Sequence, residues 1–309
     1  MSAMNQPRFE ALLREYRFTR DAPAECSLAE AQEFCRKLAR SHYENFIVAS
    51  FFLPARLKQH FYNIYAYCRI SDDLGDEAGD PGRALELLDQ WEDQLRTCFA
   101  GQARHPVFVA LRETIEAFQI PMTPFADLLH AFRQDQRVKR YDTYEQVLDY
   151  CRYSANPVGR LVLYLFGYSD EERQALSDRT CTALQLANHW QDVERDLRLL
   201  DRIYIPMQDM KRFQYTEEEL KAGICDRRFK DLMTLEVERA RQLFDEGLGL
   251  AGKVDRTLAL DVELFSRSGL QVLHGIEDVD YDVLHHRPEI TKWNRFKILA
   301  GCWWNRRRA

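Results

Sequence analysis

Residues 61–80 read FYNIYAYCRISDDLGDEAGD, and they predict a helix with one acidic face. Asp72 and Asp76 are four residues apart, so a helix places their carboxylates on the same side. The face continues toward the N-terminus of the segment through basic and aromatic side chains. The complete stripe consists of Tyr65, Arg69, Asp72, Asp73 and Asp76.

A second acidic stripe lies in residues 181–201, CTALQLANHWQDVERDLRLLD. We expect them to belong to one helix over residues 170–199, on which two aspartates are again four residues apart. An asparagine precedes this pair by four residues, and a glutamine lies three residues further back. The stripe therefore carries only oxygen-bearing side chains, those of Gln185, Asn188, Asp192 and Asp196.

The two stripes favour a bound cation. Like charges four residues apart destabilise an isolated helix by about 0.2–0.5 kcal/mol, and both pairs lie among apolar and aromatic residues. Mg²⁺ takes oxygen ligands and completes its shell with water and phosphate, so facing pairs on two helices would hold magnesium on a diphosphate. Ordinary solvated faces with salt bridges, at 72–73 and 194–196, are the alternative. The spacing alone leaves both interpretations open.

Helix signals recur along the whole chain and predict an all-α protein. Capping boxes begin at Ser27, Ser169 and Thr216, and proline follows a potential cap at Asp80 and Thr123. Periodic apolar stretches predict helices over 54–78, 81–100, 106–118, 124–138, 143–168, 170–199, 227–251 and 257–277, with a kink or break near Pro157. No lasting strand pattern, repeat or linker is present. We therefore expect a single large helical bundle over residues 1–309.

Charge and motif content exclude several classes of function. A net charge of −6 argues against nucleic-acid binding, which usually relies on a basic surface. The sequence has no Gly-rich nucleotide loop and no zinc-ligand spacing. The eight cysteines form no C-x-x-C pair, and no apolar run is long enough to cross a bilayer. We expect a cytoplasmic protein with reduced thiols.

The tail 301–309, GCWWNRRRA, combines two indoles with three arginines, a pattern typical of membrane interfaces. Peripheral contact with the inner face of the cytoplasmic membrane is one interpretation, and a flexible basic tail is the other. The sequence does not indicate an oligomeric state.

Several motifs together resemble the squalene/phytoene synthase family, whose members join prenyl diphosphates head to head. YAYCRISDDLGDE resembles the first aspartate motif of that family, and QLANHWQDVERD followed by RIYIP resembles the second. YCRYSANPVG is similar to the segment that lines the pocket opposite them. The likeness extends from about Ser41 to Trp293. It implies an all-α fold of the isoprenoid synthase type and a magnesium-dependent enzyme.

A closer likeness points to the hopanoid-pathway branch of bacteria, whose hydroxysqualene synthases act on presqualene diphosphate. The segments HYENFIVASFFLP (42–54), AFRQDQ (131–136) and YCRYSANPVGRLVLYLFG (150–167) carry it. Where first-step synthases have an H-S-K-S-F-type segment, this chain has Glu44 in place of the lysine, and Tyr43 and Asn45 in place of the serines. The loss of a positive charge and two hydroxyls argues against the binding of a second prenyl diphosphate. It favours the second half-reaction, in which presqualene diphosphate is consumed. A presqualene diphosphate or squalene synthase acting on farnesyl diphosphate is the alternative, and a non-catalytic helical assembly module is a remote one.

The resemblance also implies roles for individual residues. The ligands of Mg²⁺ would be Asp72, Asp73, Asp76, Asn188, Asp192 and Asp196. The diphosphate would contact Arg69, Arg202, Tyr65, Tyr204, Gln185 and Asn45. Candidates for positioning the attacking water are Tyr153, Asn156 and Gln185. A central apolar pocket would be lined by Phe46, Val48, Phe51, Val158, Leu161, Val162 and Leu165, for which an ordinary helix core is the alternative.

Overall fold

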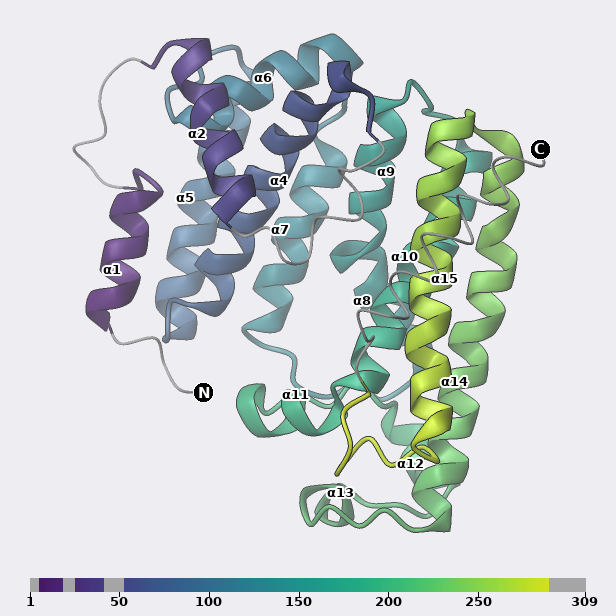
Figure 1. The fold of residues 1–309 in the computed structure, drawn as a ribbon. Coiled ribbons are helices and arrows are strands. Elements are labelled where there is room, and N and C mark those ends of the chain that lie inside the picture. The colour runs from purple at the N-terminus through teal and green to yellow at the C-terminus, as the bar shows by residue number, and fades with distance from the viewer. Residues whose placement is uncertain (1–5, 19–25, 42–52, 289–309) are drawn as a thin grey trace. The chain divides into compact units, whose positions relative to one another are not determined.

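The computed structural model describes residues 6–18, 26–41 and 53–288, and their regular structure is helical (Figure 1). Within these ranges the β-type pairing is limited to one isolated bridge between Arg140 and Ile203. The predicted all-α class is confirmed. The tail 301–309 and the segment 42–52 lie outside the described residues.

The chain divides into two compact units. The first is formed by Met1–Val138 and Arg160–Ser169, and the second by Lys139–Gly159 and Asp170–Ala309. Helix α9, Asn156–Leu165, contributes residues to both units. The expectation of a single domain over 1–309 stays a prediction.

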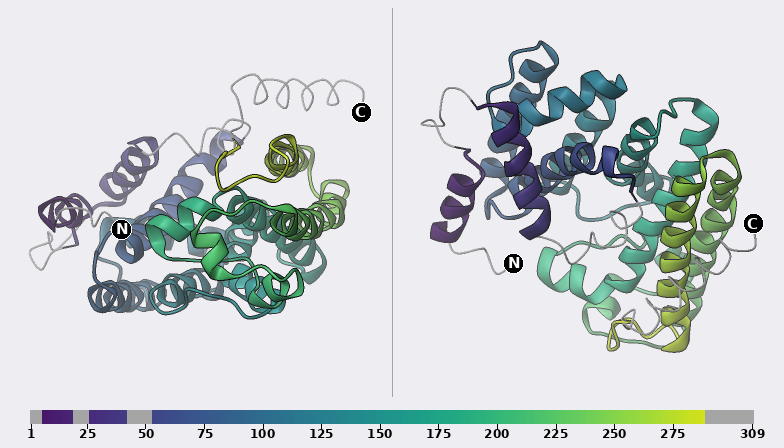
Figure 2. Two further views of the ribbon diagram at one scale, coloured as in Figure 1. Left: turned by 90° about the horizontal axis from the view of Figure 1, so that it is seen from below. Right: turned by 45° about the horizontal axis from the view of Figure 1, so that its top comes forward.

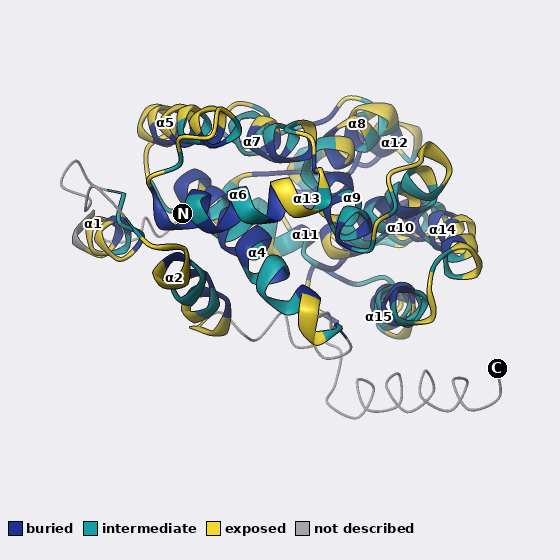
Figure 3. Cartoon of the chain, turned by 90° about the horizontal axis from the view of Figure 1, so that it is seen from above, coloured by how far each residue is buried: buried dark blue, intermediate teal, exposed yellow. Residues whose placement is uncertain are grey.

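In the first unit, helix α4 packs against α2, α5, α6 and α7. The helices of this unit are α1 (Gln6–Glu15), α2 (Leu28–Ser41), α4 (Ala55–Asp76), α5 (Pro81–Phe99), α6 (Pro106–Phe118) and α7 (Thr123–Asp135). Proline at the start of α5 and α6 suits the first helical turn, where its missing N–H has no intrahelical partner to lose. In Figure 3, α5 is exposed along one side and buried along the other, as expected of an amphipathic helix.

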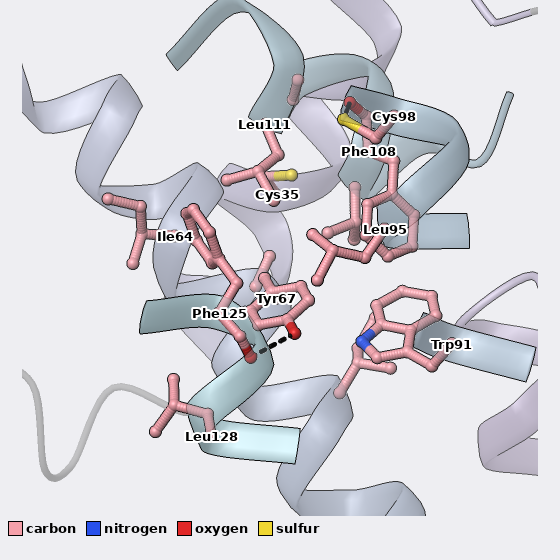
Figure 4. Packing of buried hydrophobic residues seen from close by; sticks show 14 of the residues in the cluster. Cys35, Ile64, Tyr67, Trp91, Leu95, Cys98, Phe108, Leu111, Phe125 and Leu128 are labelled. Carbon is pink, nitrogen blue, oxygen red and sulfur yellow. Dashed lines mark hydrogen bonds between the residues drawn. The ribbon is translucent and has the colours of Figure 1, made fainter. Parts of the chain in front are cut away.

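Aromatic and aliphatic side chains together fill the core of the first unit (Figure 4). The hydroxyl of Tyr67 donates to the carbonyl of Phe125 at 2.9 Å, and its ring is stacked on that of Trp91 with centroids 6.1 Å apart. The indole N–H of Trp91 donates in turn to Ser71 Oγ at 2.9 Å. Tyr67, Ile70 and Leu74 are completely buried. On a helix these positions lie opposite Tyr65, Asp72 and Asp76, so the core fixes which face of α4 carries the acidic stripe.

The second unit is built around α10, which packs against α14 and α15. Its helices are α8 (Tyr144–Ser154), α10 (Glu171–Gln191), α11 (Val193–Leu200), α12 (Met207–Arg212), α13 (Glu217–Lys221), α14 (Arg227–Gly247), the 3₁₀ helix η2 (Leu248–Lys253) and α15 (Arg256–Asp278). Helices α14 and α15 lie side by side in every view of Figures 1 and 2.

Two glycines allow these helices to pack closely: Gly247 where α14 meets α10, and Gly269 where α15 meets α14. A Cβ atom on Gly247 would lie 2.3 Å from Thr180 Oγ1, and one on Gly269 would lie 2.1 Å from the ring of Phe244. Neither position has room for a side chain, since real Cβ atoms do not approach other atoms so closely.

Two predicted helices differ from the structure, and the break expected near Pro157 is confirmed. The helix predicted over 143–168 is interrupted at Ala155, so that Pro157 falls in the first turn of α9, where it is tolerated. The helix predicted over 170–199 is interrupted at Asp192. The helix predicted over 227–251 becomes 3₁₀ after Gly247. The break after α8 was expected because Pro157 follows it closely, whereas no proline or glycine marks the end of α10.

Three of the five predicted caps are confirmed, and Thr123 is not a cap because it is the first residue of α7, which follows the cap residue Met122. Asp80 caps α5, and Thr216 with Glu219 forms a complete capping box on α13. Ser27 and Glu30 exchange the expected hydrogen bonds at the start of α2. At α10 the prediction of Ser169 is wrong, because the carboxylate of Asp170 accepts the hydrogen bond from the N–H of Arg173.

No helix in the described part of the chain is both long enough and apolar enough to cross a membrane.

Candidate active site

The acidic stripe of α4 keeps two carboxylates accessible. The side chain of Asp72 is 43% exposed, and Asp76 is exposed at the last residue of the helix. Although Arg69 lies 3.6 Å from Asp72 Oδ2, desolvation and the negative charge of Asp76 raise the pKa of Asp72 to about 7. The protein therefore concentrates negative charge here, which a bound cation would relieve.

Asp73 has different surroundings from its two neighbours. Its side chain is 3% exposed, and Oδ2 accepts hydrogen bonds from the Tyr16 hydroxyl and from Arg69 Nε, the latter at 2.9 Å. Its other oxygen, Oδ1, accepts from Arg69 Nη2. Among the predicted metal ligands, Asp73 is thus a buried partner of Arg69. Tyr65, on the same stripe, is half-buried, and burial raises its pKa.

The second stripe is interrupted where α10 ends at Gln191. Asp192 lies between the two helices with φ −107° and ψ 18°. Its N–H donates to the carbonyl of Asn188 at 3.0 Å, and the N–H of Asp196 donates to the carbonyl of Asp192 at 2.8 Å. The hydrogen bonds of a helix therefore continue through the interruption. Asn188, Asp192 and Asp196, which are four residues apart, still follow one side of it.

Asp192 is paired with an arginine that sequence reasoning missed. Arg287 Nε lies 2.5 Å from Oδ1, and Arg287 Nη2 lies 3.2 Å from Oδ2. The carboxylate is 17% exposed, and Arg195 approaches it only to 3.8 Å. Because Arg287 follows Asp192 by 95 residues, no local pattern could have indicated the contact.

His189 connects three of the predicted residues. Its ring is stacked on that of Tyr204, with centroids 3.5 Å apart. Gln185 Nε2 lies 3.3 Å from His189 Nε2, and Asp196 Oδ2 lies 3.9 Å from Nδ1. Burial lowers the pKa of His189, which favours the neutral ring. A neutral ring that accepts from Gln185 at Nε2 carries its proton on Nδ1, toward Asp196.

A small cavity of about 10 Å³ lies beside this histidine, with room for about one water molecule. Its lining includes Asp196, Arg202 and Tyr204 as well as His189. Asp196, Arg202 and Tyr204 thus lie together around the cavity, and Gln185 contacts His189. The histidine at their centre had no assigned role.

The other two candidates for positioning water lie elsewhere in the second unit. Asn156 is buried, and its Oδ1 accepts a hydrogen bond from Thr182 Oγ1 at 2.9 Å. Tyr153 is half-buried, with the guanidinium of Arg152 5.3 Å from its ring centroid. Neither residue lines the cavity beside His189, and Gln185 does not line it either.

The predicted apolar pocket is only partly described. Leu161 and Leu165 are fully buried in the core of the first unit, and Val162 packs against that core. These three residues have the surroundings of ordinary core side chains. Val158 is 43% exposed. Phe46, Val48, Phe51 and the predicted diphosphate contact Asn45 lie outside the described residues.

The sequence was compared with models of known protein families. The model described as squalene/phytoene synthase matches residues 39–294. The chain belongs to the squalene/phytoene synthase family. The predicted family is thereby confirmed, and the chain is an enzyme that acts on prenyl diphosphates.

Individual members of the squalene/phytoene synthase family are similar over most of their length. A phytoene synthase from Arthrospira platensis is 31% identical, over 88% of this chain and 92% of its own. A hydroxysqualene synthase from Zymomonas mobilis is 32% identical, over 84% of this chain and 88% of its own. The crystal structure of the squalene synthase HpnC from Alicyclobacillus acidocaldarius is 49% identical, with a TM-score of 0.79, over 82% of this chain and 95% of that one. The last comparison confirms the isoprenoid synthase fold.

Proposed function

We propose that the chain is a hydroxysqualene synthase, which converts presqualene diphosphate and water to hydroxysqualene and diphosphate. The similarity to HpnC at 49% identity and to the Zymomonas mobilis hydroxysqualene synthase supports this branch of the family. The observation that carries the choice of substrate is the segment 42–46, HYENF, in which an acid replaces the expected lysine. A site for a second prenyl diphosphate would need that positive charge.

The reaction breaks the carbon–oxygen bond between the prenyl chain and the diphosphate. The electron pair leaves with the diphosphate, and the cyclopropylcarbinyl cation that remains rearranges and opens. A water oxygen then bonds to the cation and releases one proton. No reductant is consumed, in contrast to a reaction that ends with hydride transfer.

The aspartates of both stripes fit magnesium as the cofactor. Among the described residues, no three acidic, histidine or cysteine side chains form a complete metal site. Mg²⁺ commonly takes one or two carboxylates and fills its remaining positions with water and phosphate, so pairs suffice. Asp72 and Asp76 would hold it on α4, and Asp192 and Asp196 on the second stripe. When bound, it would act as a Lewis acid that stabilises the diphosphate leaving group.

The basic residues would bind the phosphate oxygens. Arg69 is held by Asp73 and extends Nη1 toward Asp72, and charge-assisted donors of this kind bind phosphate strongly. Arg202 and Tyr204 line the cavity beside Asp196 and His189. Of the three candidates for orienting water, the structure favours Gln185, because it contacts His189. Asn156 already accepts a hydrogen bond from Thr182.

A synthase that condenses two prenyl diphosphates is the second candidate. The phytoene synthase of Arthrospira platensis, at 31% identity, is as similar to the chain as the Zymomonas mobilis enzyme. This candidate predicts consumption of farnesyl diphosphate in the absence of presqualene diphosphate.

The test is to incubate the purified protein with presqualene diphosphate and Mg²⁺ in water enriched in ¹⁸O, without NADPH. We expect hydroxysqualene that carries one ¹⁸O atom, identified by mass spectrometry. One parallel reaction contains farnesyl diphosphate in place of presqualene diphosphate. Another contains presqualene diphosphate together with NADPH. Presqualene diphosphate formed from farnesyl diphosphate, or product formed only with NADPH, would instead support one of the other synthases.

A further inference from the structure

The turn that follows helix α1 contributes Tyr16 to the acidic stripe of α4, although both precede the residues matched by the family model, 39–294. One face of the segment is buried through Phe9, Leu13 and Tyr16, which belong to the core of the first unit. Arg8, Glu10 and Arg14 on the other face are exposed. The segment is therefore docked by a regular amphipathic pattern.

Tyr16 is anchored at both ends. Its backbone carbonyl accepts a hydrogen bond from His105 Nε2 at 2.6 Å. His105 Nδ1 accepts from the N–H of Val107 at 3.2 Å, so the ring proton lies on Nε2, which suits donation to Tyr16. At the far end of the side chain, the hydroxyl donates to Asp73 Oδ2. Tyr16 is completely buried, so the ring has no freedom to leave this position without undocking α1.

The hydroxyl of Tyr16 completes the environment of a buried carboxylate. Arg69 donates to both oxygens of Asp73, and Tyr16 provides the remaining donor. A buried charge is costly unless its oxygens are hydrogen-bonded. With three donors on its two oxygens, Asp73 holds Arg69 on the stripe and is not available as a ligand for a metal ion beside Asp72 and Asp76.

We propose that Tyr16 is a positioning residue for diphosphate binding. It fixes Asp73 as the anchor of Arg69 and keeps this carboxylate out of the metal site, so that α1 forms part of the binding apparatus. The inference rests on the role proposed for Arg69 toward diphosphate. It does not require that the prenyl group be that of presqualene diphosphate.

The test uses inorganic diphosphate as the probe, titrated calorimetrically into the full-length protein in the presence of Mg²⁺. Tyr16→Phe removes only the hydroxyl and leaves the ring to dock α1. We expect its affinity for diphosphate to fall at least about ten-fold, the lower end of the range for losing one hydrogen bond to a charged group. Tyr67→Phe is the matched control, because Tyr67 is a completely buried tyrosine of α4 whose hydroxyl donates to the carbonyl of Phe125 on the side opposite the stripe, and its affinity should equal that of the parent.

A second variant separates positioning from docking. Asp73→Asn keeps the size of the side chain but weakens its hold on Arg69, so it should lower the affinity for diphosphate at least as much. In the double variant, Tyr16→Phe should add nothing, because the hydroxyl acts through Asp73. Parent affinity in Tyr16→Phe, or in a folded Asp73→Asn protein, would overturn the proposal. Because the probe has no prenyl chain, failure of the hydroxysqualene synthase assay would leave this result standing.

Discussion

The guanidinium of Arg287 lies against both carboxylate oxygens of Asp192, with Nε 2.5 Å from Oδ1 and Nη2 3.2 Å from Oδ2. Asp192 is one of the proposed magnesium ligands. The positive charge of Arg287, which is distant in the sequence, therefore lies where the protein is expected to bind a cation. Arginine and metal would compete for the same oxygens.

Removal of this arginine should increase the response to magnesium. We expect Arg287→Gln to bind Mg²⁺ several-fold more tightly than the parent and to show a larger rise in melting temperature on its addition, because Asp192 has lost its counter-ion. Arg195→Gln is the control, since Arg195 is 56% exposed and lies 3.8 Å from Asp192, and exposed pairs contribute little. Equal magnesium affinity in Arg287→Gln and the parent would contradict the competition.

Substitution of the accessible aspartates of α4 should remove activity without unfolding the protein. Asp72→Asn and Asp76→Asn each keep the side-chain volume and lose a metal-binding charge. We expect a loss of at least about 100-fold in diphosphate release, by analogy with the removal of other charge-stabilising groups, with an unchanged circular dichroism spectrum. Asp93→Asn, on the exposed face of α5, should retain full activity. Full activity in Asp72→Asn would refute the assignment of this stripe.

Glu236 should make the second unit less stable as the pH rises. It is completely buried, and although Arg239 donates to it at 3.0 Å, burial raises its pKa to about 8. The folded state then binds more protons than the unfolded state between the ordinary pKa of a glutamate and about 8, so stability is lost through that window.

Glu236→Gln should flatten this pH dependence, which thermal unfolding at pH 5, 6.5 and 8 would measure. The variant should gain about 3–4 kcal/mol over the parent between pH 5 and pH 8, given about 1.4 kcal/mol for each pH unit below the raised pKa. Glu238→Gln, whose side chain is 73% exposed, should follow the parent at every pH. Parallel curves for the parent and Glu236→Gln would show that the buried glutamate does not titrate in this range.

Gly269→Ala should weaken the packing of α15 on α14. The new methyl group would lie 2.1 Å from the ring of Phe244 and 2.9 Å from Leu184. Overpacking of this kind costs about 1–3 kcal/mol, visible as a lower melting temperature. Gly252→Ala is the matched control, because an added Cβ meets nothing within 4 Å there. An unchanged melting temperature for Gly269→Ala would mean that the two helices separate easily.

The stripe of α4 could be predicted because the information is local. Tyr65, Arg69, Asp72 and Asp76 recur at helical spacing, and the residues between them are apolar enough to be buried on the opposite face. The same reasoning found the caps at Asp80 and Thr216, which depend on residues three positions away.

Other features depend on contacts between distant residues. The end of α10 at Gln191 has no proline or glycine to mark it, and Arg287 and Tyr16 lie 95 and 57 residues from the aspartates that they contact. Asp73 was grouped with Asp72 and Asp76 because spacing cannot distinguish a buried anion from an exposed one. His189 had no metal-ligand spacing and was therefore given no role. Its ring contact with Tyr204 could not be predicted, because the two residues are distant in the sequence.

Helix α9 has a consequence for how the chain is made. Its residues from Arg160 onward belong to the first unit, and Leu161 and Leu165 lie in that unit's core. A ribosome that has synthesised residues 1–138 has therefore not yet produced all the side chains that this core needs. The first unit can be completed only after the beginning of the second has emerged, so the two units cannot fold strictly in the order of synthesis, and expression of residues 1–138 alone should yield an incomplete core.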